Sequence, residues 1–371
     1  MFRIFLFSLA VLLTIVGCSS NSGKVSTASN PVLKGDIGRI AFGSCLRQWA
    51  PQPVLKSIVK AQPDAFIFMG DNVYSDVGPY RQQAEPQRIG SAYSDLAFNP
   101  DFKQFSAAVR QQNIHLAATW DDHDYGVNDG GAEYPFKQAS KGYFAAFFGL
   151  DESRLGEAFG PGVYHSQYVN SAGLSVQLIL LDTRSFRSPL KRSAGACAPT
   201  GIVANNADDA TVLGETQWQW LKSELEKPAD LRLIASSIQL LASEHCFEKW
   251  ANFPQERRRF FQLIKDTGAE AVVLLSGDRH LGEISRYQAS TLNYPLYEVT
   301  SSGLNSALPS NSPASKEPNA LRVGGNNLLL DNFGVVEIRV DNGDTLLALQ
   351  LRDSEGNIRR EERVPLKLLK K

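Results

Sequence analysis

Short apolar runs recur along the chain and alternate with longer stretches in which apolar residues have helical spacing. The runs are rich in Val, Ile, Leu and Phe, a composition typical of strands buried on both faces of a sheet. We predict strands at residues 39–43, 64–69, 114–119, 176–182, 231–238 and 271–276. We predict helices at residues 51–61, 101–112, 137–148, 214–227 and 255–266.

Beyond residue 290 the pattern changes to strand-like segments joined by turn residues. The segments read YPLYEVTSS, GVVEIRV and TLLALQLRD, and residues 341–344 (DNGD) are typical of a hairpin turn. This pattern predicts an antiparallel end section, and the whole chain predicts a layered α/β sandwich with mixed sheets. Residues 35–371 contain no repeat or linker, so we predict one domain, with 305–320 as a mobile surface loop near the site.

Composition adds a size class and excludes some partners. The 371 residues are 43% hydrophobic and 10% aromatic, which is enough for a sizeable core, and the formal net charge is -1. A nearly neutral chain has no general electrostatic attraction for nucleic acid or anionic membranes. We therefore expect an enzyme-sized globular monomer that does not hold nucleic acid as a stable partner.

The N-terminus has the features of an export signal. Arg3 precedes an apolar stretch that is too short to cross a bilayer comfortably, and Cys18 and a Ser-rich segment follow at once. The ending Ile-Val-Gly-Cys resembles the bacterial lipobox. We expect 1–18 to be a lipoprotein signal peptide, 19–34 a flexible tether, and a lipid on Cys18 to anchor an exported protein facing the periplasm or the cell surface. The alternative is an ordinary secretory signal with a chance Cys.

Three cysteines then remain in an oxidising compartment, so at least one thiol is unpaired. Cys45 ends a strand-like run at a polar cluster, whereas Cys197 and Cys246 lie in loop-like surroundings. A disulfide between Cys197 and Cys246 is the hypothesis that this favours, although the sequence does not fix the connectivity. Cys45 is then a metal ligand or a buried, inert thiol.

Three predicted strands stop at polar clusters of the same chemical kind: GDNVY (70–74), WDDHD (120–124) and SGDRH (276–280). The ends of neighbouring strands in an open α/β sheet converge, so clusters remote in sequence can meet around shared ions. Carboxylate and imidazole groups at such an edge are typical of metal-assisted hydrolysis. We therefore expect a metal site there.

The clusters differ in specificity. Asp71 is a hard oxygen ligand able to bridge two cations, and Tyr74 can add a phenolate, but a lone Asp at a strand end is often a turn residue. Residues 120–129 hold four Asp and one His, a charge concentration that is costly unless cations or donors neutralise it. Asp278 and His280 have a spacing that can put both side chains on one side. The alternatives are a solvated acidic loop for residues 120–129 and a capping Asp beside a surface His for Asp278 and His280.

The other histidines carry less information, because a lone His is usually structural. We expect His115 to be a packed core residue and His165 to line a strand face. His245 lies in a loop where it can line a pocket together with neighbouring polar and aromatic residues. These neighbours are Gln239, Glu244, Lys249 and Trp250.

Seven motifs, taken in order and at these intervals, carry a resemblance to a known family. They are FGSC, GDNVYSD, WDDHDYGVND, LLDTRSFR, LGETQWQWL, SSIQ with EKWANFP, and SGDRH, and they span about residues 38–305. This set resembles the PhoD-like alkaline phosphatase/phosphodiesterase D family of metallophosphoesterases. The resemblance implies a calcineurin-like αββα sandwich with a site for two or more metal ions, and is less specific for substrate.

Carried over residue by residue, the resemblance implies a ligand set. Cys45 matches a thiolate ligand, Asp71 the ligand that bridges metals, and Tyr74 a phenolate ligand. Thiolate and phenolate together favour iron as Fe3+, with calcium or another divalent cation beside it. Asp278 and His280 match the last metal motif.

The WDDHD region is less certain, since either Asp122 or Asn128 takes the ligand position that other metallophosphoesterases give to an Asn. His123 matches the proton donor to the leaving oxygen. The resemblance makes Arg184 a contact for phosphate oxygens, while Asp182 either orients loops or binds metal.

The implied function is an exported hydrolase of phosphoric esters, of alkaline phosphatase or phosphodiesterase type, which uses metal-activated water for in-line attack on a small phosphate-ester substrate. No Ser lies in a segment suited to a nucleophile, apart from Ser44 and Ser276, which are placed as turn residues. Two alternatives stay open: a phospholipase C-like hydrolase at the membrane surface, and a non-catalytic, lipid-anchored envelope protein that binds calcium. The polar character of 305–320 disfavours the former. The set Cys45, Tyr74 and His123 disfavours the latter, because a passive calcium site needs neither a thiolate nor a proton donor.

Overall fold

The computed structural model describes residues 37–151, 162–341 and 343–370. The predicted signal peptide 1–18 and tether 19–34 lie outside the described residues. Within the described part of the chain, no helix is long and apolar enough to cross a membrane.

The described strands form two mixed sheets, of six and seven strands. The first sheet has the order β13 (Ile358–Pro365), β12 (Asp344–Asp353), β11 (Asn332–Asp341), β1 (Ile37–Gly43), β2 (Ala65–Met69), β3 (His115–Thr119). The second has the order β10 (Arg322–Leu328), β8 (Gly282–Tyr287), β9 (Leu296–Ser301), β7 (Val272–Ser276), β6 (Leu231–Ala235), β5 (Leu174–Leu180), β4 (His165–Ser171). Strands β1, β2 and β3 are parallel, as are β5, β6, β7 and β9, and the outer strands are antiparallel.

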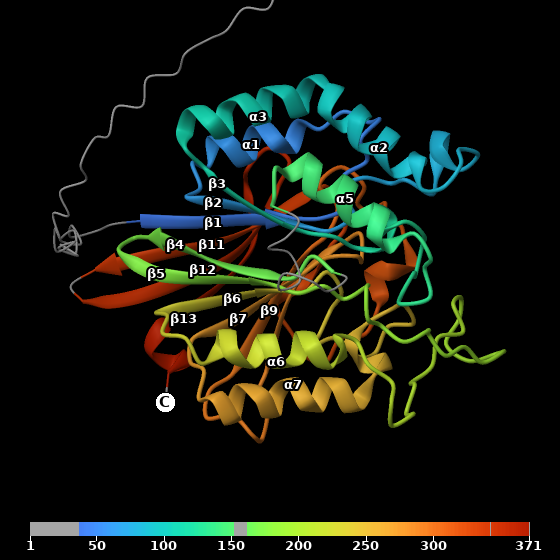
Figure 1. Cartoon of the computed structure of the whole chain (residues 1–371). Helices are drawn as coiled ribbons and strands as arrows, with labels where there is room; N and C mark the ends of the chain where they lie inside the picture. Colours follow the sequence, from blue (N-terminus) through green and yellow to red (C-terminus); the bar gives the residue numbers. More distant parts are fainter. Residues whose placement is uncertain (1–36, 152–161, 342, 371) are drawn as a thin grey trace, which may run out of the picture. The chain divides into compact units, whose positions relative to one another are not determined.

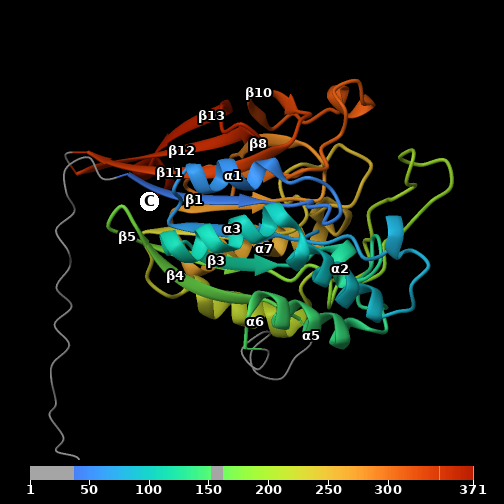
Figure 2. The same ribbon diagram turned by 90° about the horizontal axis from the view of Figure 1, so that it is seen from above.

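Helices cover the outer faces of the two sheets, which gives the αββα layers visible in Figure 1. Figure 2 looks down on the side of α1 and α3, which lie over the strands. The α-helices are α1 (Pro53–Lys60), α2 (Gln87–Phe98), α3 (Pro100–Gln112), α4 (Asp122–Tyr125), α5 (Lys137–Phe148), α6 (Gly214–Leu225) and α7 (Pro254–Thr267). Short 3-10 turns are η1 (Gly78–Tyr80), η3 (Trp250–Asn252), η4 (Pro313–Lys316) and η5 (Leu366–Leu369). The expected α/β sandwich with mixed sheets is confirmed.

Alternation along β1 shows how one strand serves both core layers. Ile40 and Phe42 point into the core shared with the second sheet, whereas Ala41 points into the core beneath the helices α1, α2, α3 and α5. Successive side chains of a strand point to opposite faces, so a strand buried on both sides is apolar throughout. This is why the predicted buried strands appear as continuous apolar runs.

Local signals set the helix ends. Pro53 opens α1, where its missing N–H costs nothing, and Val54, Leu55 and Ile58 form the buried face. The side chain of Asn99 caps α3 by accepting from the backbone N–H groups of residues 101 and 102. Such caps and apolar spacing are local properties, which is why the five predicted helices are confirmed to within a few residues.

Several elements depart from the prediction. Helix α2 and strands β8, β10 and β13 were not predicted, and β9 pairs parallel with β7 as well as antiparallel with β8. Strands β10 (RVGGNNL) and β13 (IRREERVP) are edge strands that are rich in Gly or charge. Edge strands need no continuous apolar run, so the sequence pattern gives them no strong signal.

Two histidine predictions have different outcomes. The expectation that His115 packs in the core is wrong: it is exposed at the first position of β3, at the end of the strand opposite the predicted site. His165 does line β4, as expected, and its Nδ1 lies 2.8 Å from the carbonyl oxygen of Val163. Neither residue belongs to the polar clusters at the strand ends.

Candidate metal centre

Polar residues from both sheets converge where parallel strands end. Cys45 follows β1, Asp71 follows β2, residues 121–124 follow β3, and Asp278 follows β7. The sheets are joined at this edge by a parallel bridge between Ser44 and Ser302. The carboxyl ends of parallel strands therefore bring together residues that are more than 200 positions apart in the sequence.

Cys45, Asp71 and His280 form the first group, with their ligand atoms all within 4.8 Å of one another. The Cys45 Sγ lies 3.4 Å from Asp71 Oδ2 and 3.0 Å from Ser302 Oγ. His280 Nδ1 lies 2.6 Å from the carbonyl oxygen of Ser306, which fixes the tautomer that donates from Nδ1. Nε2 is then left with a free lone pair, the arrangement typical of metal-bound histidines.

Tyr74 lies against this first group. Its hydroxyl is 3.4 Å from His280 Nε2, and its ring centroid is 4.4 Å from that of His123. The side-chain amide of Gln48 accepts from the Tyr74 N–H and donates to the Tyr74 carbonyl, so it fixes the backbone here. The structure thus places the predicted thiol, phenol, carboxylate and imidazole together.

Two carboxylates link the first group to two others. Asp71, Asp122 and His123 form the second group, and Asp121, Asp122 and Asp278 form the third, each with ligand atoms within 4.8 Å. Asp71 belongs to the first and second groups, and Asp122 belongs to the second and third. The three groups therefore form one continuous chain of ligand atoms rather than separate sites.

Four of these residues have a left-handed backbone. The φ angles are 63° at Cys45, 50° at Asp71, 69° at Asp278 and 54° at His280. Residues other than Gly rarely adopt this conformation, which costs about 1–2 kcal/mol per residue. Such strain clusters at functional sites, where the surrounding fold imposes it. Here it turns each chain sharply out of its strand, so that the side chain faces the common centre.

Gly70 permits the closest approach at this edge. Its φ is 99°, and a Cβ atom at this position would lie 2.5 Å from the Cβ of Asp121. Only glycine therefore lets the exit of β2 lie against the exit of β3.

Burial and mutual repulsion make the cluster unfavourable without cations. Burial, and then the charge of Asp71, raise the pKa of the Cys45 thiol, while burial and the neighbouring aspartates raise the pKa of Asp71 despite the opposing effect of His123. Burial also raises the pKa of Asp278, with Asp121 and Asp122 next in effect. Among the described residues, Asp121 Oδ2 and Asp122 Oδ1 are buried oxygens without a hydrogen-bond partner. Buried, unpartnered anionic oxygens beside a thiol, a phenol and an imidazole fit a site for metal ions.

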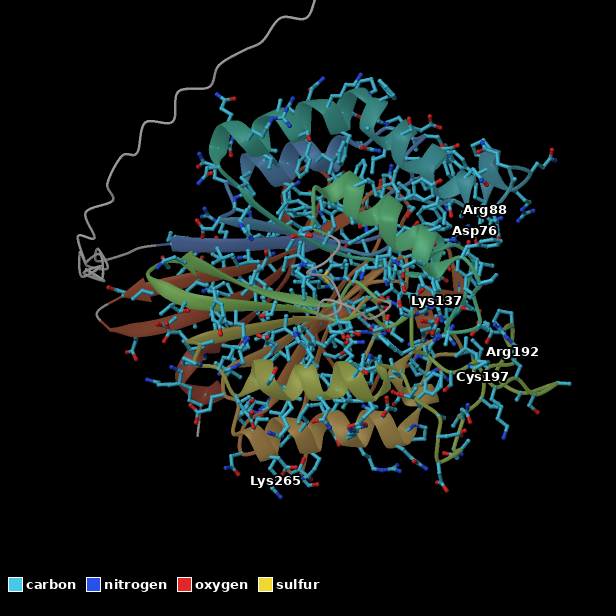
Figure 3. The ribbon with its side chains drawn as sticks, viewed as in Figure 1. Asp76, Arg88, Lys137, Arg192, Cys197 and Lys265 are labelled. Carbon is cyan, nitrogen blue, oxygen red and sulfur yellow. A yellow bond between two sulfur atoms is a disulfide. The ribbon has the colours of Figure 1, made fainter. Side chains whose placement is uncertain are left out.

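His123 is held by a carboxylate outside the three groups. Its Nδ1 lies 2.5 Å from Asp76 Oδ1, so Nε2 is the nitrogen left for other chemistry. Burial lowers the pKa of His123, but the charges of Asp122, Asp71 and Asp76 outweigh burial and raise it. Asp76 lies at the rim of this edge in Figure 3. Its carboxylate orients the imidazole. Asp76 is the last residue of the motif GDNVYSD, and this role was not predicted from the sequence.

Asp124 has a structural role that the sequence did not separate from its neighbours. Its carboxylate accepts from the backbone N–H groups of Asp71, Asn72 and Asp121, and from the hydroxyl of Tyr93. These bonds tie the exits of β2 and β3 together. Asp121 was likewise not predicted as a site residue, although it lies within the acidic cluster that was identified.

Arg184 is buried rather than exposed to a ligand, as a phosphate contact would need to be. Its guanidinium is fully buried, with Nε 2.6 Å from Asp121 Oδ1 and Nη1 2.7 Å from Glu248 Oε2. The side chain holds Asp121 in place and presents no exposed surface to a ligand. Asp182 accepts from the N–H groups of Val163, Arg184 and Ser185, so its carboxylate orients loops.

Asn128 is a predicted ligand that lies at the surface, away from the buried groups. It is exposed, and its backbone N–H donates to Asp76 Oδ2 at 2.7 Å. Asp122, the alternative for this position, is buried in two of the three groups. The geometry therefore favours Asp122 over Asn128.

Basic residues flank the acidic centre near Asp278. Lys249 and Arg279 are both buried, and Arg279 lies 4.3 Å over the ring of Phe247 and binds Glu317 at 2.6 Å. Burial, and then the charge of Arg279, lower the pKa of Lys249 to about 8. His245 is buried beside them and accepts from the Phe247 N–H. The pocket predicted around His245 stays a prediction.

A disulfide joins two loops of the chain, and one end of the 305–320 segment reaches the centre. Cys197 and Cys246 form the disulfide that the sequence favoured, and Cys45 is a free, buried thiol. Arg192, near Cys197 in Figure 3, forms an ion pair with Asp129. The Leu308 N–H donates to the carbonyl oxygen of His280, so this segment reaches the site, as expected.

Comparisons with known proteins agree with this geometry. Residues 163–348 match the sequence model of the family described as PhoD-like phosphatase. Alkaline phosphatase D of Bacillus subtilis (strain 168) is 25% identical over an alignment of 293 residues that covers 70% of this chain and 48% of that protein. The chain thus spans about half the length of this relative.

Solved structures show the same fold. A structure of PhoD superposes with a TM-score of 0.65 at 18% identity, covering 91% of this chain and 70% of that one. GAP50, the anchor in the inner membrane complex of Plasmodium, superposes with a TM-score of 0.53 at 12% identity, covering 91% and 90%. The family match begins after β3, so Cys45, Asp71 and Asp122 lie outside the matched residues. The fold nevertheless brings them to the same centre as Asp278 and His280. The chain belongs to the PhoD-like phosphatase family.

Proposed function

We propose that this chain is an exported, metal-dependent phosphoric ester hydrolase. The observation that carries the proposal is the continuous chain of ligand atoms in which Asp71 and Asp122 are shared between groups. When bound there, metal ions neutralise the oxygens of a phosphate ester and lower the pKa of the water that attacks it. The similarity to alkaline phosphatase D supports the same activity.

The donor set supports two kinds of cation. Cys45, Tyr74, His280 and Asp71 offer a thiolate, a phenolate, an imidazole and a carboxylate, a set suited to Fe3+. Asp122, Asp121 and Asp278 supply oxygen alone and suit calcium or another hard cation. Asp71 is placed to serve both. We propose this division of ligands for the metals in the cell.

We propose His123 as the proton donor to the leaving oxygen. Asp76 holds its Nδ1, which leaves Nε2 for proton transfer, and His123 belongs to one group with Asp71 and Asp122, where a phosphate ester would bind. A general acid contributes about 10²–10⁴-fold, and most where the leaving group is a poor one.

Export and lipid anchoring at Cys18 are part of the proposal. The Cys197–Cys246 disulfide supports export, because disulfides persist in oxidising compartments and are rare in reducing ones. The periplasmic face of a membrane and the cell surface both meet this condition.

Metal removal tests the activity directly. The chain without residues 1–18 is stripped with a chelator, assayed at alkaline pH against p-nitrophenyl phosphate and bis-p-nitrophenyl phosphate, and reloaded with iron and calcium in turn. We expect hydrolysis to vanish on stripping and to return only when both metals are restored, with bound metal measured by elemental analysis. Bound metal without hydrolysis of either ester would instead indicate a non-catalytic binding protein.

A leaving-group series tests His123. In His123→Ala we expect hydrolysis of an alkyl phosphate ester to fall by about 10²-fold or more, and of a p-nitrophenyl ester much less, because p-nitrophenolate leaves without a proton. In Asp76→Asn we expect the pH profile for hydrolysis of the alkyl ester to shift, and the profile for the p-nitrophenyl ester to change much less. Bound metal should stay at the wild-type level. An equal loss for both leaving groups would contradict the assignment.

A further inference from the structure

The segment 46–51 leads from the end of β1 to α1, beside the metal centre, and its backbone is fixed by side chains from other elements. Asn305 accepts from the Arg47 N–H at 2.7 Å and donates to the carbonyl oxygens of Arg47 and Pro51. Asn99 donates to the carbonyl oxygens of Gln48 and Ala50. We call residues 46–51 the β1–α1 loop. Its many bonds make it a rigid support.

Side chains of the β1–α1 loop alternate between the interior and the surface. Leu46 and Gln48 are buried, and Gln48 carries the bonds to Tyr74. Arg47 and Trp49 are exposed. A rigid loop that begins next to Cys45 therefore presents one cation and one aromatic ring outward at the edge of the centre.

Arg47 is a cation placed within reach of a bound anion. Its guanidinium carbon lies 5.9 Å from the centroid of the Tyr74 ring, whose hydroxyl is 3.4 Å from His280 Nε2. Among the described residues, no carboxylate lies within ion-pair distance of Arg47. An exposed guanidinium fork here can bind phosphate oxygens, the role that buried Arg184 does not fill.

Trp49 is an exposed ring that is nevertheless held in place. Its side chain is 43% exposed, whereas the other four tryptophans of the chain are at most 5% exposed. Its ring centroid lies 6.3 Å from that of Tyr74 and 6.0 Å from that of Tyr80. A Cβ atom on Gly78 would lie 3.1 Å from the indole, and Gly78 has a φ of 59°, so the indole rests on a position suited to glycine. The remaining surface of a fixed indole is a preformed stacking platform.

We propose that Trp49 and Arg47 select phosphate esters with a flat aromatic leaving group of nucleobase size, the ring stacking on Trp49 while Arg47 binds a phosphate oxygen. This inference rests on the proposed function, because it places the ester phosphorus at the metal centre. It adds the class of the leaving group: a nucleoside phosphate is preferred over a small aliphatic ester of the same charge. Stacking of one base on an aromatic ring contributes about 1–3 kcal/mol, or about 5–150-fold in affinity.

Binding is measured with two phosphonates that cannot be hydrolysed, so that turnover does not enter. They are the methylene phosphonate analogue of adenosine 5′-monophosphate and methylphosphonate, each titrated into the metal-loaded full chain. Trp49 is the exposed tryptophan, so we expect the adenosine analogue, and not methylphosphonate, to quench the fluorescence. We expect the adenosine analogue to bind at least about 10-fold more tightly.

Variants separate the two side chains. Trp49→Ala should reduce the preference for the adenosine analogue about 10-fold, and Trp49→Phe should restore the preference without the fluorescence change. Arg47→Ala should weaken both phosphonates, and Arg47→Lys should recover part of the loss. Phe98→Ala is the matched control, since Phe98 is 70% exposed at the end of α2, and it should leave both affinities unchanged.

The outcomes distinguish this inference from the function beneath it. Equal affinity for the two phosphonates, or an unchanged preference in Trp49→Ala, would overturn the role of the ring. Binding of neither phosphonate would overturn both proposals. Selective quenching by the adenosine analogue without hydrolysis of any ester would uphold the ring site and overturn the hydrolase.

Discussion

Asp71→Asn is expected to reduce bound metal and to lower hydrolysis by at least about 100-fold. Loss of a group that only supports a metal ligand costs up to about 100-fold, and loss of a direct ligand should cost at least as much. Asp71 has this effect because it belongs to both the group with Cys45 and His280 and the group with Asp122 and His123. A neutral amide cannot supply the charge that holds cations on either side. Elemental analysis and the ester assay measure the two losses together.

The same substitution should not lower the thermal stability of the metal-free protein. Burial and the charges of Asp122, Asp121 and Asp124 raise the pKa of Asp71, so its ionised form is destabilising when no cation is bound. Without metal, Asp71→Asn should therefore unfold at a temperature equal to or above that of the wild type. With metal the order should reverse, because a ligand that binds the folded state stabilises it. Asp266→Asn, on α7, is the control, and a lower midpoint in the metal-free variant would contradict the repulsion argument.

Arg184→Met is expected to lower the free energy of unfolding by about 3–5 kcal/mol, the range for breaking a buried ion pair. The guanidinium is fully buried between Asp121 and Glu248, and Met leaves Asp121 without its cation, although the hydrogen bond from Ser237 remains. Glu248 retains a second partner, Arg187. Denaturant unfolding at pH 8 measures the loss.

The loss should be smaller in acid. Burial raises the pKa of Asp121 to about 7 even with Arg184 present, and removal of the cation raises it further. A carboxyl whose pKa is raised on folding binds more protons in the folded state, so its destabilising effect fades as the pH falls below that pKa. We therefore expect a smaller difference between variant and wild type at pH 5 than at pH 8. Arg363→Met, from an exposed pair with Glu361, should cost about 0–1 kcal/mol at both pH values.

The main elements of the fold could be predicted because their signals are local. Continuous apolar runs identified the buried strands, and helical spacing of apolar residues identified the helices. Edge strands β10 and β13 lacked such signals because only tertiary pairing makes them strands. The exposed position of His115 likewise depends on which end of β3 faces solvent.

The site was predicted as a set of residues but not as a set of roles. The sequence by itself determined that Cys45, Asp71, Asp278 and His280 would stand where apolar runs end, and the convergence of parallel strands then brought them together. Only the tertiary structure decided what each aspartate after β3 does. Asp121 meets Arg184, Asp122 joins two ligand groups, and Asp124 accepts backbone N–H groups. Neighbouring carboxylates are alike in sequence, and they acquire different functions only from the remote groups that the fold places against each one.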